Sequence, residues 1–227
     1  SGEIDYSSIY SSLDFLSKLA IKNNKYPLII IRSTAVSGTT DKLAEKYPKF
    51  RFIFNPEFLT EKDALKDMEN TSRIVIGVND KESKEKVLAI YKPVFPNAKY
   101  VVVDRKTAEM IKYAANVFLA SQVGIANEIY NICQVLGVDY DIVREAILLD
   151  NRIGKNINVP GPDGDFGFGG KCFPKDLNAL IHLAREYMYR PYLLEEVWRL
   201  NEKIRKNKDW FEIKGATSEN NFDKKES

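Results

Sequence analysis

Four short apolar runs, each separated from the next by a segment of helical character, most constrain the fold of this chain. The runs are PLIIIRST (27–34), RFIFNPE (51–57), RIVIGV (73–78) and KYVVVD (99–104). A continuous apolar run is typical of a strand covered on both faces, and strands that alternate with helices favour a parallel sheet. Residues 1–103 are therefore predicted to form an α/β layer with a parallel sheet.

The pattern changes at Asp104, which is a favourable N-cap for a helix. This helix is predicted to be long, over residues 105–136, and to stop before Gly137. Apolar residues occur on more than one of its sides, so we expect it to pack against several elements. Three shorter helices are predicted to follow it, over 140–149, 174–188 and 191–207.

These patterns predict three parts of the chain. Residues 1–103 form the α/β part, 104–207 an all-helical domain with one long helix, and 208–227 a linker or the start of a further domain. A Gly/Pro/Asn-rich loop, NRIGKNINVPGPDGDFGFGG, interrupts the helical part. A loop of this length inside a compact domain is usually either functional or disordered.

Composition excludes several classes of function. Charged residues make up 29% of the chain and nearly cancel, at a formal net charge of +2, so the basic excess usual for a nucleic-acid-binding protein is missing. Neither a membrane-spanning run nor a signal peptide is visible in the sequence. The two cysteines do not form a disulfide framework, which favours the cytoplasm. With His182 as the single histidine, no metal site is predicted.

The segment GFGGKCFPKD (167–176) contains one of the two cysteines and is the first candidate site. Pro174 suits the first turn of a helix, which places Cys172 at or just before a helix N-terminus, where the thiolate is favoured. The glycines permit positive φ and the close approach of a ligand, and Asp176 could serve as a base. The alternative is a buried structural cysteine at a turn. Cys133, which lies next to Ile132 on the apolar long helix, is likewise interpreted as a buried structural residue.

Two further groups of polar residues are candidates. Lys112 and Asn116 are four residues apart on the predicted long helix and so share a face, where a desolvated lysine could donate to an oxyanion. From that segment alone, an exposed and solvated lysine is the favoured interpretation. Glu57 and Glu61 follow one predicted strand and Thr34 follows another, and ligands of α/β sheets collect beyond the carboxyl ends of strands.

Together these segments resemble the nucleotide-sugar 6-dehydrogenase family. GFGGKCFPKD matches the family's cysteine motif, NPEFLTEKDALKDMENTSRIVIG looks like its NPEFL segment and following strand, and TAEMIKYAANVFLASQVGIANEI looks like its central helix. RSTAVSGTT and NRIG resemble its Ser-Thr turn and its Arg-Ile-Gly segment. The resemblance implies a partial Rossmann-like parallel sheet, NAD as the cofactor, a cytoplasmic homodimer that pairs through the long helix, and synthesis of a polysaccharide precursor.

The resemblance also implies a role for each candidate residue. Cys172 would be the nucleophile, which forms a thiohemiacetal and then a thioester. Catalytic roles with the water, the proton and the oxyanion would fall to Asp176, Lys112, Asn116, Thr34 and Glu57. The residues that would face NAD are Thr34, Glu61 and Lys175. Those that would hold the UDP-sugar are Glu57, Phe58, Leu59, Thr60, Lys112, Asn116, Phe168, Gly169 and, from a neighbouring subunit, Arg152.

Members of this family oxidise the C6 alcohol of the sugar to a carboxylate in two NAD-dependent steps. The pair Lys175-Asp176 argues against the UDP-N-acetylmannosamine branch, and NRIG favours UDP-glucose over GDP-mannose, which stays the alternative substrate. The resemblance thus implies that UDP-glucose is converted to UDP-glucuronate.

The chain departs from the family at both ends. It has no Gly-x-Gly-x-x-Gly turn, so it is expected to begin partway through the dinucleotide domain and to stop where a UDP-binding domain begins. Two interpretations of the isolated chain follow: it is an enzyme of this type, or, as the alternative, it is a non-catalytic dimerisation fragment. A cysteine hydrolase is disfavoured, because His182 lies ten residues from Cys172 and the two would be about 15 Å apart on one helix.

Overall fold

The computed structural model of the protein describes residues 4–59 and 63–213. The chain forms two compact units, one of Tyr6–Lys112 and one that begins at Tyr113. Helix α5 (Arg105–Leu136) contributes to both units, because the division falls within it. The three domain ranges expected from the sequence stay predictions.

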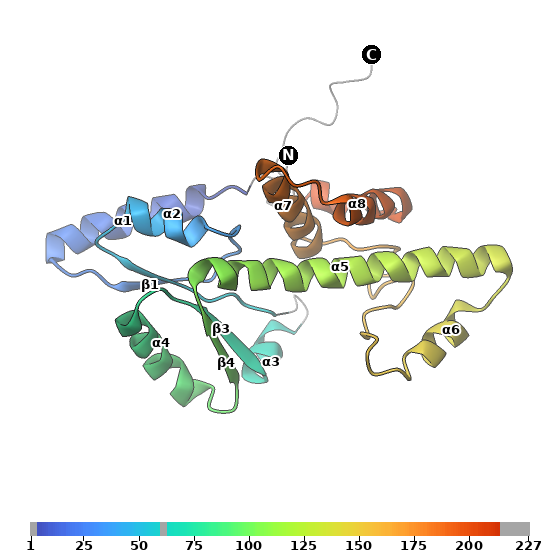
Figure 1. The fold of residues 1–227 in the computed structure, drawn as a ribbon, viewed down its shortest axis with the longest axis horizontal. Helices are drawn as coiled ribbons and strands as arrows, with labels where there is room; N and C mark the ends of the chain where they lie inside the picture. Colours follow the sequence, from blue (N-terminus) through green and yellow to red (C-terminus); the bar gives the residue numbers. More distant parts are fainter. Residues whose placement is uncertain (1–3, 60–62, 214–227) are drawn as a thin grey trace, which may run out of the picture. The chain divides into compact units, whose positions relative to one another are not determined.

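The first unit contains a four-stranded sheet in the order β1-β2-β3-β4 (Figure 1). The strands are β1 (Leu28–Ile31), β2 (Arg51–Phe54), β3 (Arg73–Gly77) and β4 (Lys99–Val103), which confirms the four predicted strands. β1 pairs with β2 and β3 with β4 in parallel, whereas β2 and β3 are antiparallel. Among the residues that the structure describes between β2 and β3, the one helix is α3 (Ala64–Glu69), which has 6 residues and is shorter than the helices that usually link parallel strands.

Helices cover both faces of this sheet, and its strands are apolar for that reason. The helices are α1 (Ser7–Asn23), α2 (Thr39–Lys46) and α4 (Lys81–Val94), with α4 on the face opposite to α1 and α2 (Figure 1). Side chains alternate between the faces of a strand. Phe52 and Phe54 of β2 accordingly pack in the cluster of α1 and α2, while Ile53 packs with Val87 of α4.

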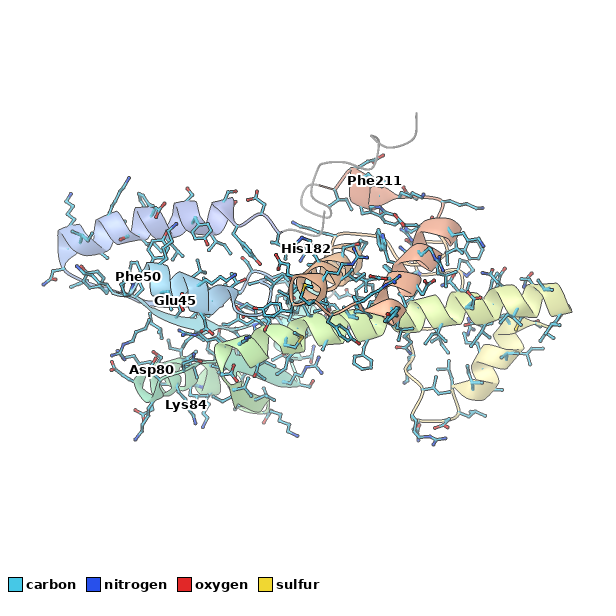
Figure 2. All side chains as sticks on the ribbon, turned by 45° about the horizontal axis from the view of Figure 1, so that its top comes forward. Glu45, Phe50, Asp80, Lys84, His182 and Phe211 are labelled. Carbon is cyan, nitrogen blue, oxygen red and sulfur yellow. The ribbon has the colours of Figure 1, made fainter. Side chains whose placement is uncertain are left out.

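Two aspartates begin the helices that flank β4, and Asp104 is the cap predicted from the sequence. The Asp80 carboxylate accepts a hydrogen bond from the backbone N–H of Ser83 at 2.9 Å at the start of α4 (Figure 2). The Asp104 carboxylate does the same for Thr107 at 2.9 Å, and α5 then runs for 32 residues. The helix ends before Gly137, whose φ is +67°. The predicted single long helix is therefore confirmed.

The second unit is helical. It contains the C-terminal part of α5, then α6 (Tyr140–Ile147), α7 (Cys172–Glu186), α8 (Tyr192–Ile204) and the 3₁₀ turn η1 (Asp209–Phe211). Val117 of α5, Leu177 of α7 and Val197 of α8 pack in one buried cluster. Cys133 is buried in a second cluster, which confirms its interpretation as a structural residue. Among the helices of the described residues, none is long and apolar enough to cross a membrane.

Candidate active site

Cys172 is the first residue of α7, which confirms the position predicted from the motif. Pro174 lies in the first turn of the helix, where its missing N–H leaves no acceptor unpaired. The chain reaches this turn through Gly167 and Gly170, which have φ values of +65° and +71°. These positive values explain two of the glycines of the motif, because other residues rarely adopt them.

Asp176 lies one turn after Cys172 on α7 and is buried, with its side chain 1% exposed. One carboxylate oxygen accepts a hydrogen bond from the side-chain amide of Asn116 on α5. The other is 2.5 Å from the ammonium nitrogen of Lys175. A buried carboxylate needs such partners, which compensate its charge and fix its orientation. Three of the predicted site residues therefore meet here, one helical turn from the cysteine.

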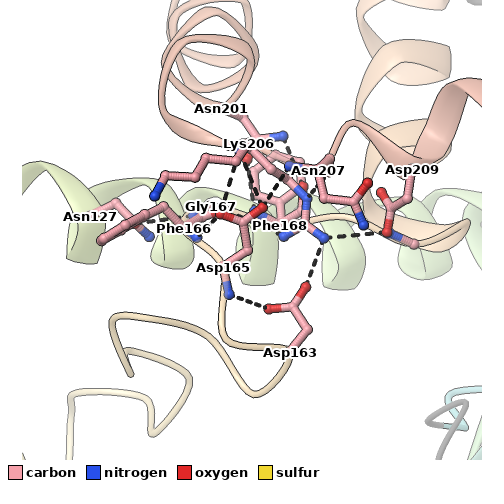
Figure 3. Close-up of polar contacts among 12 residues, drawn as sticks. Asn127, Asp163, Asp165, Phe166, Gly167, Phe168, Asn201, Lys206, Asn207 and Asp209 are labelled. Carbon is pink, nitrogen blue, oxygen red and sulfur yellow. Dashed lines mark hydrogen bonds and ion pairs between the residues drawn. The ribbon is translucent and has the colours of Figure 1, made fainter.

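The glycine-rich segment before Cys172, residues 163–170, is called here the cysteine loop. Three of its backbone N–H groups donate to side chains from elsewhere in the second unit (Figure 3). Gly167 donates to Asn127 at 3.1 Å, Phe168 to Asn201 at 2.7 Å, and Gly170 to Asp209 at 3.1 Å. Sequence analysis did not single out these three acceptors.

Two glycines of the cysteine loop have protein side chains where a Cβ would stand. A Cβ on Gly167 would lie 2.2 Å from the amide oxygen of Asn201, and one on Gly169 would lie 2.1 Å from a guanidinium nitrogen of Arg205. The sequence suggested that these glycines make room for a ligand. The structure shows that at 167 and 169 they make room for side chains at the end of α8, and the approach of a ligand stays a prediction.

Lys112 lies in the first unit and is buried, with its side chain 7% exposed. Its ammonium donates to the backbone carbonyl of Glu57 at 2.7 Å and is 3.6 Å from the Glu57 carboxylate. The same nitrogen lies 5.3 Å from the centre of the Phe58 ring. The favoured interpretation of Lys112 as a solvated residue was therefore wrong. Its apolar neighbours on the helix were the correct signal.

Asn55 fixes the start of the segment that contains Glu57. Its side chain donates to Val75 of β3 at 2.8 Å and accepts from the hydroxyl of Tyr91 of α4 at 2.8 Å. Its backbone N–H donates to Ile31 of β1 at 2.8 Å. Sequence analysis missed this residue, although a buried asparagine at the end of an apolar strand signals such bridging.

Glu109 is a second residue that sequence analysis missed. It is fully buried on α5, and its carboxylate accepts hydrogen bonds from the N–H of Gly38 at 2.5 Å and from the N–H and hydroxyl of Thr40 at 2.7 and 2.6 Å. Burial raises the pKa of this carboxyl, while the three hydrogen bonds act in the opposite direction. Glu109 thereby anchors the turn that follows Thr34. A lone carboxylate within the apolar stripe next to Met110 was the available signal.

The remaining predicted residues are placed as follows. Thr60 and Glu61 lie outside the described residues. Thr34 is half-buried after β1, and Arg152, 90% exposed, pairs with Asp150. His182 lies on α7 beside Glu186, with its side chain 34% exposed (Figure 2). The described residues contain no group of three or more His, Cys, Asp or Glu that could hold a metal ion.

Lys112 belongs to the first unit, whereas Asn116, Cys172 and Asp176 belong to the second. That all four line one pocket stays a prediction. The same holds for the contacts of Leu59, Phe168 and Gly169 with a substrate. The backbone N–H and C=O of Phe168 are both engaged by Asn201 within the protein.

Two models of one protein family match most of the chain. The NAD binding domain of the UDP-glucose/GDP-mannose dehydrogenase family matches residues 1–95, and the central domain of the same family matches residues 106–203. The match to the central domain includes the cysteine loop, Lys112, Asn116 and Asp176.

Individual relatives agree with these matches. The chain is 40% identical over 208 residues to a UDP-glucose 6-dehydrogenase of Rickettsia bellii, which covers 89% of the chain and 46% of the relative. A solved UDP-glucose dehydrogenase from Pyrobaculum islandicum superposes with a TM-score of 0.81 at 34% identity, over 89% of this chain and 47% of that one. A ternary complex of GDP-mannose dehydrogenase from Pseudomonas aeruginosa gives 0.61 at 29% identity, over 89% and 48%. The chain thus spans about half the length of the curated relatives that it matches.

Proposed function

Because the chain belongs to the UDP-glucose/GDP-mannose dehydrogenase family, we propose that it contributes the catalytic cysteine and its partners to the NAD-dependent oxidation of UDP-glucose to UDP-glucuronate. The observation that carries the proposal is Cys172 at the start of α7, with Asp176 one turn further and bonded to Asn116. GDP-mannose is the alternative substrate, and the relative named for it is the less similar one, at 29% against 34% and 40% identity.

The need for a thiolate follows from the reaction. Oxidation of an alcohol to a carboxylate removes two hydrides, and the second can leave only from a tetrahedral adduct of the intermediate aldehyde. Attack of the Cys172 thiolate forms that adduct, a thiohemiacetal, and loss of hydride from it leaves a thioester. Water then cleaves the thioester, which releases the carboxylate and restores the cysteine.

The neighbours of Cys172 supply the remaining groups. We assign the Asp176 carboxylate, which is held by Asn116 and Lys175, to orient the hydrolytic water and accept its proton. The amide of Asn116 has two N–H bonds, and we assign the one not directed at Asp176 to the oxyanion of the tetrahedral adducts. Lys112 donates to the carbonyl of Glu57. We assign to it the transfer of the proton of the sugar alcohol and the stabilisation of the oxyanion.

We assign residues of the first unit to the binding of the nicotinamide end of NAD. β1 and β2 are parallel neighbours, so Thr34 and Glu57 follow strand ends at the same edge of the sheet, where ligands of such sheets bind. At the start of α2, the N–H groups of the N-cap Gly38 and of Thr40 are bonded to Glu109, and that of Thr39 to the carbonyl of Val36, so this helix start is not the pyrophosphate site. When bound, NAD accepts the hydrides. Thr34, Glu61 and Lys175 are the residues assigned to hold it.

We assign the dimer contact to α5. Phe118, Ile125 and Ile132 are spaced seven residues apart along one side of the helix and are 78%, 57% and 50% exposed. Apolar side chains in such a row are typical of helices that pair across a two-fold axis. The exposed Arg152 is then available to a neighbouring subunit's substrate. A cytoplasmic location and a role in making polysaccharide precursors belong to the same proposal.

The test is reduction of NAD by the purified protein with UDP-glucose, followed by absorbance, with GDP-mannose assayed in parallel. Cys172→Ser should abolish formation of the acid, and the matched variant Cys133→Ser should retain it. Faster reduction with GDP-mannose would overturn the choice of substrate. A protein that forms dimers but reduces NAD with neither sugar would support the alternative, a non-catalytic dimerisation module.

A further inference from the structure

The side chain of Asn201 pairs with the cysteine loop at two points. Its amide oxygen accepts from the N–H of Phe168 at 2.7 Å, and its amide nitrogen donates to the carbonyl of the same residue at 2.9 Å. Asn201 is 1% exposed, so no water competes for these bonds. Two antiparallel bonds to one residue fix both the position and the rotation of its peptide groups, as strand pairing does.

Arg205 fixes the loop on either side of Phe168. Its guanidinium is 2% exposed and binds the carboxylate of Asp163 at 2.7 Å and that of Asp209 at 3.3 Å. It also donates to the carbonyl of Asn207 at 2.8 Å and fills the place of a side chain at Gly169. Hydrogen bonds to this many acceptors restrict a buried guanidinium to one position.

These contacts extend to the residues directly before Cys172. The N–H of Gly170 donates to the same Asp209 carboxylate that binds Arg205. The position of the first turn of α7 is therefore set by the end of α8 and by η1, which lie 29 or more residues further along the chain. We propose that Asn201 and Arg205 are positioning residues for Cys172, which fix the cysteine loop so that the thiol stands at the start of α7. This rests on the proposed role of Cys172 as the nucleophile.

The pH profile of Cys172 alkylation by iodoacetamide tests this proposal without NAD or sugar. The rate is measured on the purified protein by peptide mass spectrometry, which separates Cys172 from Cys133. In Asn201→Ala the apparent midpoint should differ from that of the parent by about half a unit or more, because the reactivity of a thiol depends on its place relative to the helix start and nearby charges. Asn201 is uncharged, so its replacement leaves Lys175, Asp176, Arg205 and Asp209 in place, and a shift must come from movement of the thiol relative to them.

Two further variants test whether the midpoint of Cys172 alkylation changes in step with the contacts that are lost. Asn201→Asp keeps an acceptor for the Phe168 N–H but has no donor for its carbonyl, so its midpoint should lie between those of the parent and Asn201→Ala. Arg205→Lys keeps the charge but loses the fork that joins Asp163 to Asp209, and it should also shift the midpoint. Arg199→Gln is the matched control, because Arg199 is 75% exposed on the same helix and should leave the profile unchanged.

Hydrogen exchange separates positioning from stability alone. Peptides that cover residues 163–170 should exchange about tenfold faster in Asn201→Ala, as expected for a lost buried hydrogen bond, while α7 and α5 keep their protection. Faster loop exchange with an unchanged Cys172 profile in every variant that folds would overturn the proposal, and so would no change in either. If Asn201→Ala does not fold, Asn201→Asp and Arg205→Lys decide.

Turnover distinguishes a failure of this inference from a failure of the proposed function. In a catalytically active form of the protein, Asn201→Asp should lower kcat more than it raises KM, because the thiol acts in the chemical steps. A protein without dehydrogenase activity whose Cys172 profile still depends on Asn201 would retain the positioning role and lose the proposed reaction.

Discussion

The two cysteines show how the surroundings of a residue decide its chemistry. Cys133 is 6% exposed among apolar side chains, where a thiol acts as a small apolar residue. Cys172 begins a helix and is followed one turn later by a carboxylate with two partners. The first residue is predicted to be tolerant of small substitutions, and the second is not.

Replacement of Cys172, the proposed nucleophile, gives the most direct activity prediction. In Cys172→Ser the hydroxyl has a far higher pKa than a thiol and is a poor nucleophile for the aldehyde. Formation of the acid should therefore fall by about three orders of magnitude or more, as when other covalent nucleophiles are removed. Binding of UDP-glucose, measured by calorimetry, should change little. Acid production near the parental rate would show that Cys172 is structural.

Glu109 gives the stability of the fold a predictable dependence on pH. Burial raises its pKa, so the folded protein holds the proton more tightly than the unfolded chain does. This group therefore stabilises the fold below its unfolded pKa of about 4.3, and that contribution is lost as the pH rises through the folded pKa.

Urea unfolding at a series of pH values checks this sign. The free energy of unfolding of the parent, relative to that of Glu109→Gln, should fall as the pH rises from about 4. Glu45→Gln, at an exposed position on α2 (Figure 2), should give a curve parallel to that of the parent. A difference that grows in favour of the parent with rising pH would contradict the raised pKa.

At the scale of elements, β3 and α5 approach each other closely at one glycine. A Cβ on Gly77 would lie 2.6 Å from the Cβ of Ala108 and 2.8 Å from the Cα of Arg105. Gly77→Ala should therefore force strand and helix apart and lower the free energy of unfolding by about 1–3 kcal/mol.

Gly124 of α5 provides the matched control. A Cβ there would meet only Val197, at an ordinary 3.5 Å, and alanine is favoured over glycine within a helix. Gly124→Ala should thus raise the free energy of unfolding, by about 0.5–1 kcal/mol. The two variants add the same methyl group, so chemical denaturation should show opposite signs. The same sign for both would mean that the close contact at Gly77 does not decide the effect of its replacement.

The elements could be predicted from the sequence, whereas several contacts of the site could not. The local signals were the apolar runs, the cap Asp104 and the stop at Gly137, and the structure confirms them. The pairing of Asn201 with Phe168 joins residues 33 positions apart, and no local pattern marks it. Lys112 was misjudged for a related reason, because its burial depends on a segment 55 residues away.

At the scale of the whole molecule, the prediction concerns the exposed apolar row of α5. If a second copy covers it, a charge in the row should separate the subunits, because an unpaired buried charge is strongly unfavourable. Ile125→Glu should shift the protein from dimer to monomer in sedimentation velocity. Met188→Glu, at a position that is 94% exposed and outside the row, should leave the parental state unchanged. Monomers of the parent would contradict the proposed pairing.

Close packing also restricts which mutations can occur together in the cysteine loop and at the end of α8. Two pairs of residues, Gly167 with Asn201 and Gly169 with Arg205, each have space for only one side chain. A mutation that enlarges one member of a pair should therefore displace the loop unless a second mutation makes the side chain of the other member smaller. In a suppressor screen, the second-site revertants of Gly169→Ala should be found at Arg205, which directly follows α8 and lies outside the cysteine motif.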